Sequence, residues 1–219
     1  MSVLSRSQIL KRLRLPVSDA QSLVVSPIFD SAQLDHDSID VRLGTHFLAF
    51  KQTQISVLDL LSDTLDSELL DYQRRIHVRF GGDLIVHPNT LILGCTLEYL
   101  RVPKDLSCQV LTRSTWGRLG LIIATAVWVH PLFAGCLTLE ILNHGTIPLR
   151  LHPGIRIAQL VFQTVGPSEQ MAVPLQQPKY ACLTRPWHAD LASEIKDINR
   201  ADTAGRAWHG QPRQAQDGT

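Results

Sequence analysis

From Arg75 onward the sequence is divided into short strand-like runs that begin about every eight to twelve residues. Turn-forming pairs such as Gly81-Gly82 and Pro153-Gly154 separate these runs. Such regular spacing is typical of all-β barrels and sandwiches. The sequence therefore predicts a mainly β fold. The expected strands are 24–29, 38–50, 76–79, 84–87, 90–93, 96–102, 107–112, 119–124, 137–142, 149–151 and 157–165.

Two features precede this region. Ser7 is a suitable N-cap for a short helix over 7–13, where apolar residues recur at helical spacing. Asp40 and Arg42 are expected on one face of a strand, because side chains two positions apart point to the same side. They form either an ordinary structural ion pair or a solvated pair.

The other segments are expected to be peripheral. The stretch 57–71 carries five carboxylates and no cation, which suggests a short helix with a solvated acidic face within an insertion over about 57–75. A minor C-terminal helix is expected over 191–198. We interpret 1–198 as a single domain and 199–219, which is polar and without periodicity, as a disordered tail.

The composition limits the class of partner. The chain has 219 residues, 44% of them hydrophobic, and a formal net charge of +1, so neither a generally basic nucleic-acid surface nor a membrane-directed one is expected. We expect neither a secretory leader, because the first residues contain no apolar run of adequate length, nor a membrane span, because no run is long enough. We expect a cytoplasmic protein that meets any anionic ligand locally, with no nucleic-acid or membrane partner.

The cysteines argue against one kind of metal chemistry. The four are Cys95, Cys108, Cys136 and Cys182, without a CxxC pair and without a His-x-Glu followed by PCxxC. Zinc-dependent cytidine deaminases use such ligands to activate water. If this chain deaminates cytosine, it is expected to do so without zinc.

One carboxylate stands out in an apolar strand. In the run LTLEIL at 137–142, strand alternation places Thr138 and Glu140 on one face and the aliphatic side chains on the other. Glu140 is either solvated on an outer face or held in a pocket. In a pocket, desolvation would raise its pKa and suit it to proton transfer.

A polar basic turn precedes this strand. The run RSTWGR at 113–118 offers two guanidinium groups, two hydroxyl groups and a glycine. It is either a surface turn or a site for the oxygens of a polyphosphate, which arginine binds well. Together with the nearby carboxylate, it suggests a nucleotide site.

Four separated blocks resemble the dCTP deaminase branch of the dUTPase superfamily. The family's SVDLRLG block is similar to SIDVRLG at 38–44, and its RSSLGRLGL block to RSTWGRLGL at 113–121. Its TAGFIDPGFSGHITLELSN block is similar to ATAVWVHPLFAGCLTLEILN at 124–143, and a late strand shared with dUTPases to RIAQLVF at 156–162. Four blocks in the same order are far more specific than one motif. The resemblance implies a distorted β-barrel that assembles as a homotrimer, with sites built between neighbouring subunits.

The same resemblance implies roles for individual residues. Glu140 would be the general base and acid, taking a proton from the water that attacks C4 of dCTP and delivering protons to N3 and ammonia. The backbone carbonyl of Ala126 would help to hold that water, Thr138 would contact the base and His130 the sugar. Residues implied to bind the triphosphate, which carries Mg²⁺ without side-chain ligands from the protein, are Arg113, Ser114, Thr115, Arg118 and Lys179.

Two departures from the family pattern keep other functions open. His130 stands where the family has an aspartate beside the sugar, and Leu183 where it has a glutamine that touches phosphate. His130 either contacts the sugar or is a neutral residue of a turn. The expected function is deamination of dCTP to dUTP; the alternatives are a dUTP pyrophosphatase, alone or combined with deamination, and a nucleotide-binding regulator without turnover.

Overall fold

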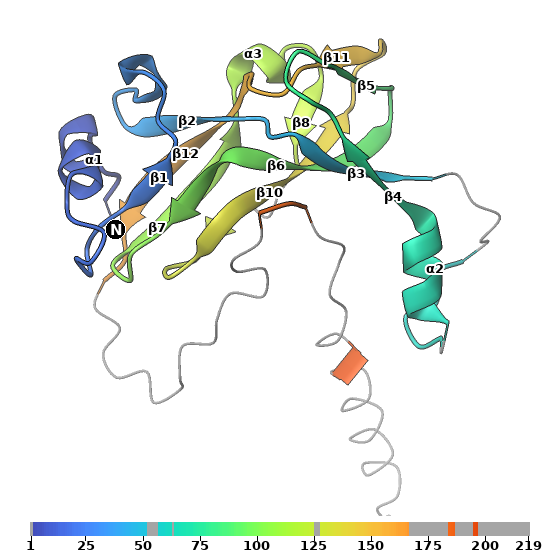
Figure 1. Ribbon diagram of the computed structural model, residues 1–219, viewed down its shortest axis with the longest axis horizontal. Coiled ribbons are helices and arrows are strands. Elements are labelled where there is room, and N and C mark those ends of the chain that lie inside the picture. Colours follow the sequence, from blue (N-terminus) through green and yellow to red (C-terminus); the bar gives the residue numbers. More distant parts are fainter. Residues whose placement is uncertain are drawn as a thin grey trace, which may run out of the picture.

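Strands dominate the computed structural model, which describes residues 2–51, 57–62, 64–124, 128–166, 184–186 and 195–196. Within these residues the sheets are antiparallel, and the helices are short and lie at the edges (Figure 1). The strands are β1 (Val24–Ser26), β2 (Ser38–Arg42), β3 (His46–Phe50), β4 (Gln73–His77), β5 (Leu84–Val86), β6 (Thr90–Arg101), β7 (Leu106–Thr112), β8 (Leu121–Ile123), β9 (Trp128–Val129), β10 (Ala134–Asn143), β11 (Leu149–Leu151) and β12 (Arg156–Thr164). The helices are α1 (Arg6–Leu13), the 3₁₀ turn η1 (Ser31–Gln33), α2 (Leu65–Tyr72) and α3 (Ser114–Gly117).

The strands form three sheets. The largest has the order β4-β3-β6-β10-β8, with β1 paired to the far end of β6; the second has the order β2-β12-β7-β9; β5 and β11 form a separate pair. The described strands do not close into one continuous barrel, so the arrangement is a distorted one. The predicted mainly β fold is confirmed.

The core lies between the inner faces of the two larger sheets. Leu139 and Ile141 of β10 are fully buried there, and so are Leu160 and Phe162 of β12. Burial alternates residue by residue along β10, which is the period-two pattern seen in the sequence. Burial of these aliphatic and aromatic side chains is the main stabilising contribution to such a fold.

Two differences from the expected strands stand out. The strand expected over 38–50 is two strands, β2 and β3, which belong to different sheets. The other difference is the length of β6. Two runs were expected, over 90–93 and 96–102, but β6 continues from Thr90 to Arg101 without a turn. A Cβ at Gly94 would lie 3.0 Å from the Ile141 side chain, so this glycine leaves room for neighbouring core side chains and does not end the strand. The two-residue strand β9 was not predicted, because so short a segment has no periodicity.

The N-terminal helix is confirmed, but its predicted cap is wrong. The N-cap is Ser5, and Ser7 lies inside the helix. The Ser5 backbone N–H donates to the Gln8 side-chain oxygen at 2.8 Å, which is half of a capping box. The glutamine three residues after Ser5 was the signal for this earlier start.

The acidic stretch is partly helical and projects from the sheets at β4 (Figure 1). Only 65–72 of it forms the helix α2. Of the helix expected over 191–198, residues 195 and 196 are described and are helical; the rest, and the tail over 199–219, lie outside the described residues. Among the helices that the structure describes, none has the length and apolar character needed to cross a bilayer.

Candidate active site

Glu140 lies on the face of β10 that points away from the core. The core side of this strand is formed by Leu137, Leu139 and Ile141, whereas Thr138 and Glu140 are half-buried on the other side, as the alternation predicted. Burial raises the pKa of the Glu140 carboxyl group above its ordinary value, because the charged form is desolvated. A raised pKa is what was expected of Glu140 if it were held in a pocket and not on a fully solvated face.

The neighbours of Glu140 across the sheet explain this desolvation. Glu140 pairs with Leu93 of β6, and Leu93 pairs with Leu48 of β3, so the three side chains share one face of the sheet. Leu93 and Leu48 are both buried, although neither belongs to the central core cluster. The carboxylate is thus placed beside aliphatic side chains and not on a fully solvated face.

The basic turn follows β7 and is fastened to β12. The Arg113 backbone N–H donates to the Ile157 carbonyl at 3.3 Å, and the Trp116 indole N–H donates to the Arg156 carbonyl at 2.8 Å. Trp116 also packs against the core, so its packing and its hydrogen bond both give it a structural role. Ser114, Thr115 and Arg118 are exposed, so their polar groups are available to a ligand.

Strand β8 connects the turn with the strand of Glu140. The Ile123 backbone N–H donates to the hydroxyl oxygen of Thr112 at 2.8 Å. Thr112 is the residue immediately before Arg113, where the basic turn begins. Ile123 also pairs with Ile141, and the next backbone N–H, that of Ala124, donates to the Glu140 carbonyl at 2.8 Å. The turn and the carboxylate therefore lie at two sides of the same short strand.

A close backbone crossing fixes the end of the turn. The His144 N–H donates to the Gly120 carbonyl at 2.8 Å, and Gly120 adopts a positive φ of 83°. A Cβ at Gly120 would lie 2.6 Å from backbone atoms of Gly145. Only glycine fits this crossing.

Asn143 was not identified from the sequence, although it supports the same region. Its side-chain amide is fully buried and donates to the Val86 carbonyl at 2.8 Å and to the Ile147 carbonyl at 2.9 Å. Its oxygen accepts from the Gly145 N–H at 2.9 Å. The available signal was its position in the run NHG, where asparagine often hydrogen-bonds a turn backbone.

Asp40 and Arg42 do not form the ion pair that was considered for them. Asp40 faces two arginines, Arg113 at 3.3 Å and Arg156 at 3.3 Å. Arg42 instead pairs with Asp30 at 3.2 Å and with Glu98 at 3.5 Å. The sequence could not show this exchange of partners, because it depends on the pairing of β2 with β12.

The other predicted site residues are only partly placed. Thr138 lies two residues before Glu140 on the same face, opposite Cys95. His130 is exposed at the end of β9, where its carbonyl accepts the Phe133 N–H at 3.3 Å. Ala126, Lys179 and Leu183 lie outside the described residues.

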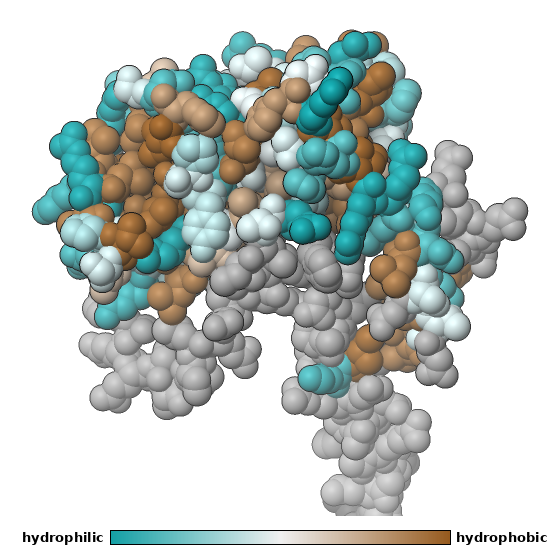
Figure 2. All heavy atoms as spheres, in the orientation of Figure 1, coloured by the Kyte–Doolittle hydropathy of each residue, from teal (hydrophilic) through white to brown (hydrophobic). Residues whose placement is uncertain are grey.

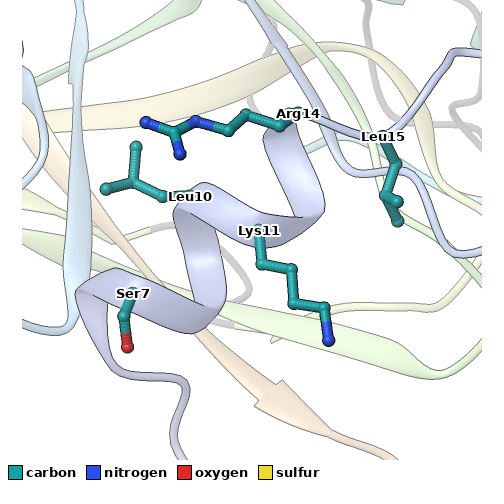
Figure 3. A pocket seen from close by; sticks show the side chains of 5 residues that line it. All are labelled: Ser7, Leu10, Lys11, Arg14 and Leu15. Carbon is teal, nitrogen blue, oxygen red and sulfur yellow. The ribbon is translucent and has the colours of Figure 1, made fainter.

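Two further features of the described part of the chain bear on ligands. It contains no group of three or more His, Cys, Asp and Glu side chains that could hold a metal ion. A hollow beside α1 is lined by Ser7, Leu10, Lys11, Arg14 and Leu15 (Figure 3). The face in view mixes hydrophobic with hydrophilic side chains near α1 (Figure 2). None of the predicted site residues lines this hollow.

Known proteins are similar to this chain over most of its length. The family model described as dCTP deaminase-like matches residues 3–165. A protein of Methanosphaera stadtmanae named "dCTP deaminase, dUMP-forming" is 37% identical over 202 residues, which cover 91% of this chain and 98% of that protein. A "dCTP deaminase" of Haloarcula marismortui is 39% identical over 162 residues, covering 73% of this chain and 79% of that protein.

The fold is also similar to that of a solved structure. The 2'-deoxycytidine 5'-triphosphate deaminase of Agrobacterium tumefaciens superimposes with a TM-score of 0.55 and 20% sequence identity. The match covers 75% of this chain, which spans about half, 48%, of the length of that chain. At this identity the likeness concerns the fold.

Proposed function

The chain belongs to the dCTP deaminase-like family, and from this premise we propose that it hydrolyses dCTP to dUTP and ammonia with Glu140 as the general base and acid. The observation that carries the proposal is the arrangement around β8, where a half-buried carboxyl group with a raised pKa lies on one side and a basic turn on the other. In this proposal Glu140 transfers protons at the cytosine base, and the arginines of the basic turn bind the phosphates.

The chemistry assigned to Glu140 is a sequence of proton transfers. Its carboxylate takes a proton from water while the oxygen attacks C4 of the cytosine ring. The protonated carboxyl group delivers this proton to N3, takes a second proton from the hydroxyl group now on C4, and delivers it to the leaving amine. The C4–N bond then breaks, C4 keeps the oxygen as a carbonyl, and ammonia departs. A pKa raised by burial suits both steps, because the group is a better base and still a competent acid near neutral pH.

Binding of the triphosphate is assigned to the basic turn. Arg113 and Arg118 supply guanidinium groups, and the exposed hydroxyls of Ser114 and Thr115 supply hydrogen bonds. Lys179 is proposed as a further phosphate contact. Mg²⁺ enters with the triphosphate as part of the substrate, since it keeps several waters and binds phosphate oxygens readily.

We also propose that the reaction needs no zinc. In this proposal Glu140 activates the attacking water by taking its proton, which is the task that a zinc ion performs in the zinc-dependent deaminases. The expected result is that a strong zinc chelator, added with excess Mg²⁺, leaves the rate of ammonia release unchanged. Loss of activity that returns on adding zinc alone would refute this part.

The identity of the product divides two versions of the function. His130 stands in place of the aspartate that the family uses near the sugar. This favours release of dUTP, because an imidazole cannot supply the fixed negative charge that orients water for attack on phosphate. The second version forms dUMP and pyrophosphate. It is favoured by the name of the Methanosphaera relative, which aligns over nearly its full length.

A homotrimer is proposed because the face that carries Glu140 also carries an apolar row. Leu91, Leu142 and Ile122 lie side by side on β6, β10 and β8. Leu91 is 36% exposed and Ile122 is 40% exposed. A neighbouring subunit on this row would bury it and would also shield Glu140 from water. Analytical ultracentrifugation should give the mass of three chains.

The proposed function is tested by incubating the protein with Mg²⁺ and dCTP, CTP or dUTP, and then separating the nucleotides by ion-exchange chromatography. Ammonia and dUTP from dCTP are expected, without pyrophosphate. Pyrophosphate together with dUMP would establish the second version. If dCTP raises the melting temperature but stays intact, the chain binds nucleotide without turnover and the proposal is wrong.

A further inference from the structure

We propose that Asp40 is a positioning residue for phosphate binding, which acts by holding the guanidinium group of Arg113 toward the triphosphate. This inference rests on the proposed function, because it assigns Asp40 to the same site. Asp40 lies on β2, far from the basic turn in sequence, and the sequence suggested for it only a structural ion pair or a solvated pair.

Asp40 lies where two arginines converge. Its side chain is 6% exposed, on a strand that pairs with β12. Its Oδ1 lies 3.3 Å from Nε of Arg113, and its Oδ2 lies 3.3 Å from Nη1 of Arg156. The basic turn, β2 and the start of β12 thus meet at one carboxylate.

The two arginines are held differently. Arg156 donates from Nη1 to both Asp40 and the Ala32 carbonyl, the latter at 3.0 Å, so this nitrogen has two acceptors. Among the described residues, the ion pair of Arg113 is with Asp40 alone, through Nε. The Arg113 guanidinium is planar, so an anchor at Nε sets the direction of its remaining N–H groups.

The contact with Arg113 is electrostatic rather than a well-aligned hydrogen bond. Among the described groups, Oδ1 of Asp40 has no hydrogen-bond partner, although it is buried. A buried carboxylate oxygen without a donor attracts the nearest cation strongly, because water does not compete with it. Asp40 therefore limits where the Arg113 side chain can lie, while that side chain stays 27% exposed.

The charge balance of the cluster favours an anion. One carboxylate faces two guanidinium groups, which leaves one excess positive charge, and Arg118 adds another on the exposed side of the same turn. A concentrated local positive charge on a nearly neutral chain is suited to a polyphosphate. Asp40 thus fixes the cations without cancelling them.

Glu98 offers a matched control inside the same molecule. Like Asp40, Glu98 is buried, with 1% of its side chain exposed, and pairs with an arginine. This arginine is Arg42 of β2, at 3.5 Å. Glu98 accepts from the Gln33 amide at 2.8 Å and from the Arg42 backbone N–H at 2.8 Å. None of these contacts reaches the basic turn, so Glu98 tests the loss of a buried carboxylate by itself.

The test compares Asp40→Asn with Glu98→Gln in steady-state kinetics and in dCTP binding by calorimetry. For Asp40→Asn, the KM and Kd for dCTP should rise by about tenfold or more, since small displacements of a binding group can cost up to ~10²-fold. kcat should stay within about threefold, because the phosphates bind alike in the ground and transition states. Glu98→Gln should change KM and Kd less than about twofold.

A double-variant cycle separates positioning from general stability. If Asp40 acts through Arg113, then Asp40→Asn should add nothing to the rise in Kd that Arg113→Gln causes alone. Additive effects, or an unchanged Kd in Asp40→Asn, would overturn the inference. If Asp40→Asn does not fold, Arg156→Gln is combined with it to remove the leftover cation, and the same rise in Kd is required.

The binding measurement distinguishes this inference from the proposed function. If wild-type protein binds dCTP without releasing ammonia, the proposed function fails, while the Asp40 inference still stands or falls on Kd. If wild type turns over and Asp40→Asn has a normal KM and Kd, only the inference fails. If wild type neither binds nor converts dCTP, both are wrong.

Discussion

The backbone N–H of Ile123 donates a hydrogen bond of 2.8 Å to the hydroxyl oxygen of Thr112. This bond joins the two larger sheets beside the candidate site, because Thr112 ends β7 and Ile123 belongs to β8. The residue after Thr112 begins the basic turn, and the strand beside Ile123 carries Glu140. One side-chain hydroxyl therefore links the proposed phosphate and base regions.

Thr112→Val should destabilise the protein by about 1–3 kcal/mol, because it leaves the N–H of the buried residue Ile123 without its acceptor. Valine keeps the shape and the strand preference of threonine, so loss of the hydroxyl is isolated. Urea denaturation measures the free energy of unfolding. Thr112→Ser, which keeps the oxygen, should lose much less, and equal losses in the two variants would count against this role of the bond.

The rate of dCTP deamination should fall at acidic pH with an apparent pKa above 4.5, the ordinary value for a glutamate. The reason is that only the ionised Glu140 can accept the proton of water, and burial raises the pKa of this group. The measurement is kcat/KM for dCTP across the acidic and neutral range. An acidic limb at or below 4.5 would show that a different group controls the rate.

Glu140→Gln should be more stable than wild type at neutral pH. A raised pKa in the folded state means that folding favours the protonated carboxyl group, so its contribution to stability is complete below 4.5 and is lost as the pH rises through the folded-state pKa. Glutamine cannot ionise and avoids that loss. Differential scanning calorimetry at several pH values should show a gap in Tm that closes toward acidic pH. A gap that does not depend on pH would contradict the assignment.

Gly120→Ala should lower the free energy of unfolding by roughly 1–3 kcal/mol, because alanine is strained at the positive φ of this position. Overpacking should add a similar cost. The added methyl group would lie 2.6 Å from the Gly145 backbone, which cannot move as a side chain could. Gly117→Ala is the control, because nothing lies within 4 Å of its added Cβ. Chemical denaturation should show little or no loss for this control, and comparable losses would contradict the crossing.

The sequence was most informative where function and local pattern coincide. Alternation along β10 correctly placed Thr138 and Glu140 on the face opposite Leu139, because a strand sets side-chain direction with a period of two. The strand-like runs likewise predicted the mainly β fold. These properties depend on neighbouring residues in the chain, which is why they could be predicted.

Contacts between distant strands could not be predicted in the same way. Spacing alone suggested Arg42 as the partner of Asp40, whereas the fold brings Arg113 and Arg156 to it. Glu98 was passed over for the same reason, since it is buried only because β6 and β2 are neighbours in the fold. The roles assigned to Glu140 and to the basic turn remain predictions that kinetics must test.

The most direct test of the central claim is the rate of ammonia release from dCTP by Glu140→Gln compared with wild type. Loss of general acid–base catalysis should lower kcat by about 10²–10⁴-fold, while the variant stays folded and still binds dCTP. Dependence of turnover on this carboxylate would identify it as the proton-transfer group. A variant that releases ammonia at the wild-type rate would show that Glu140 is not that group and would contradict the proposed mechanism.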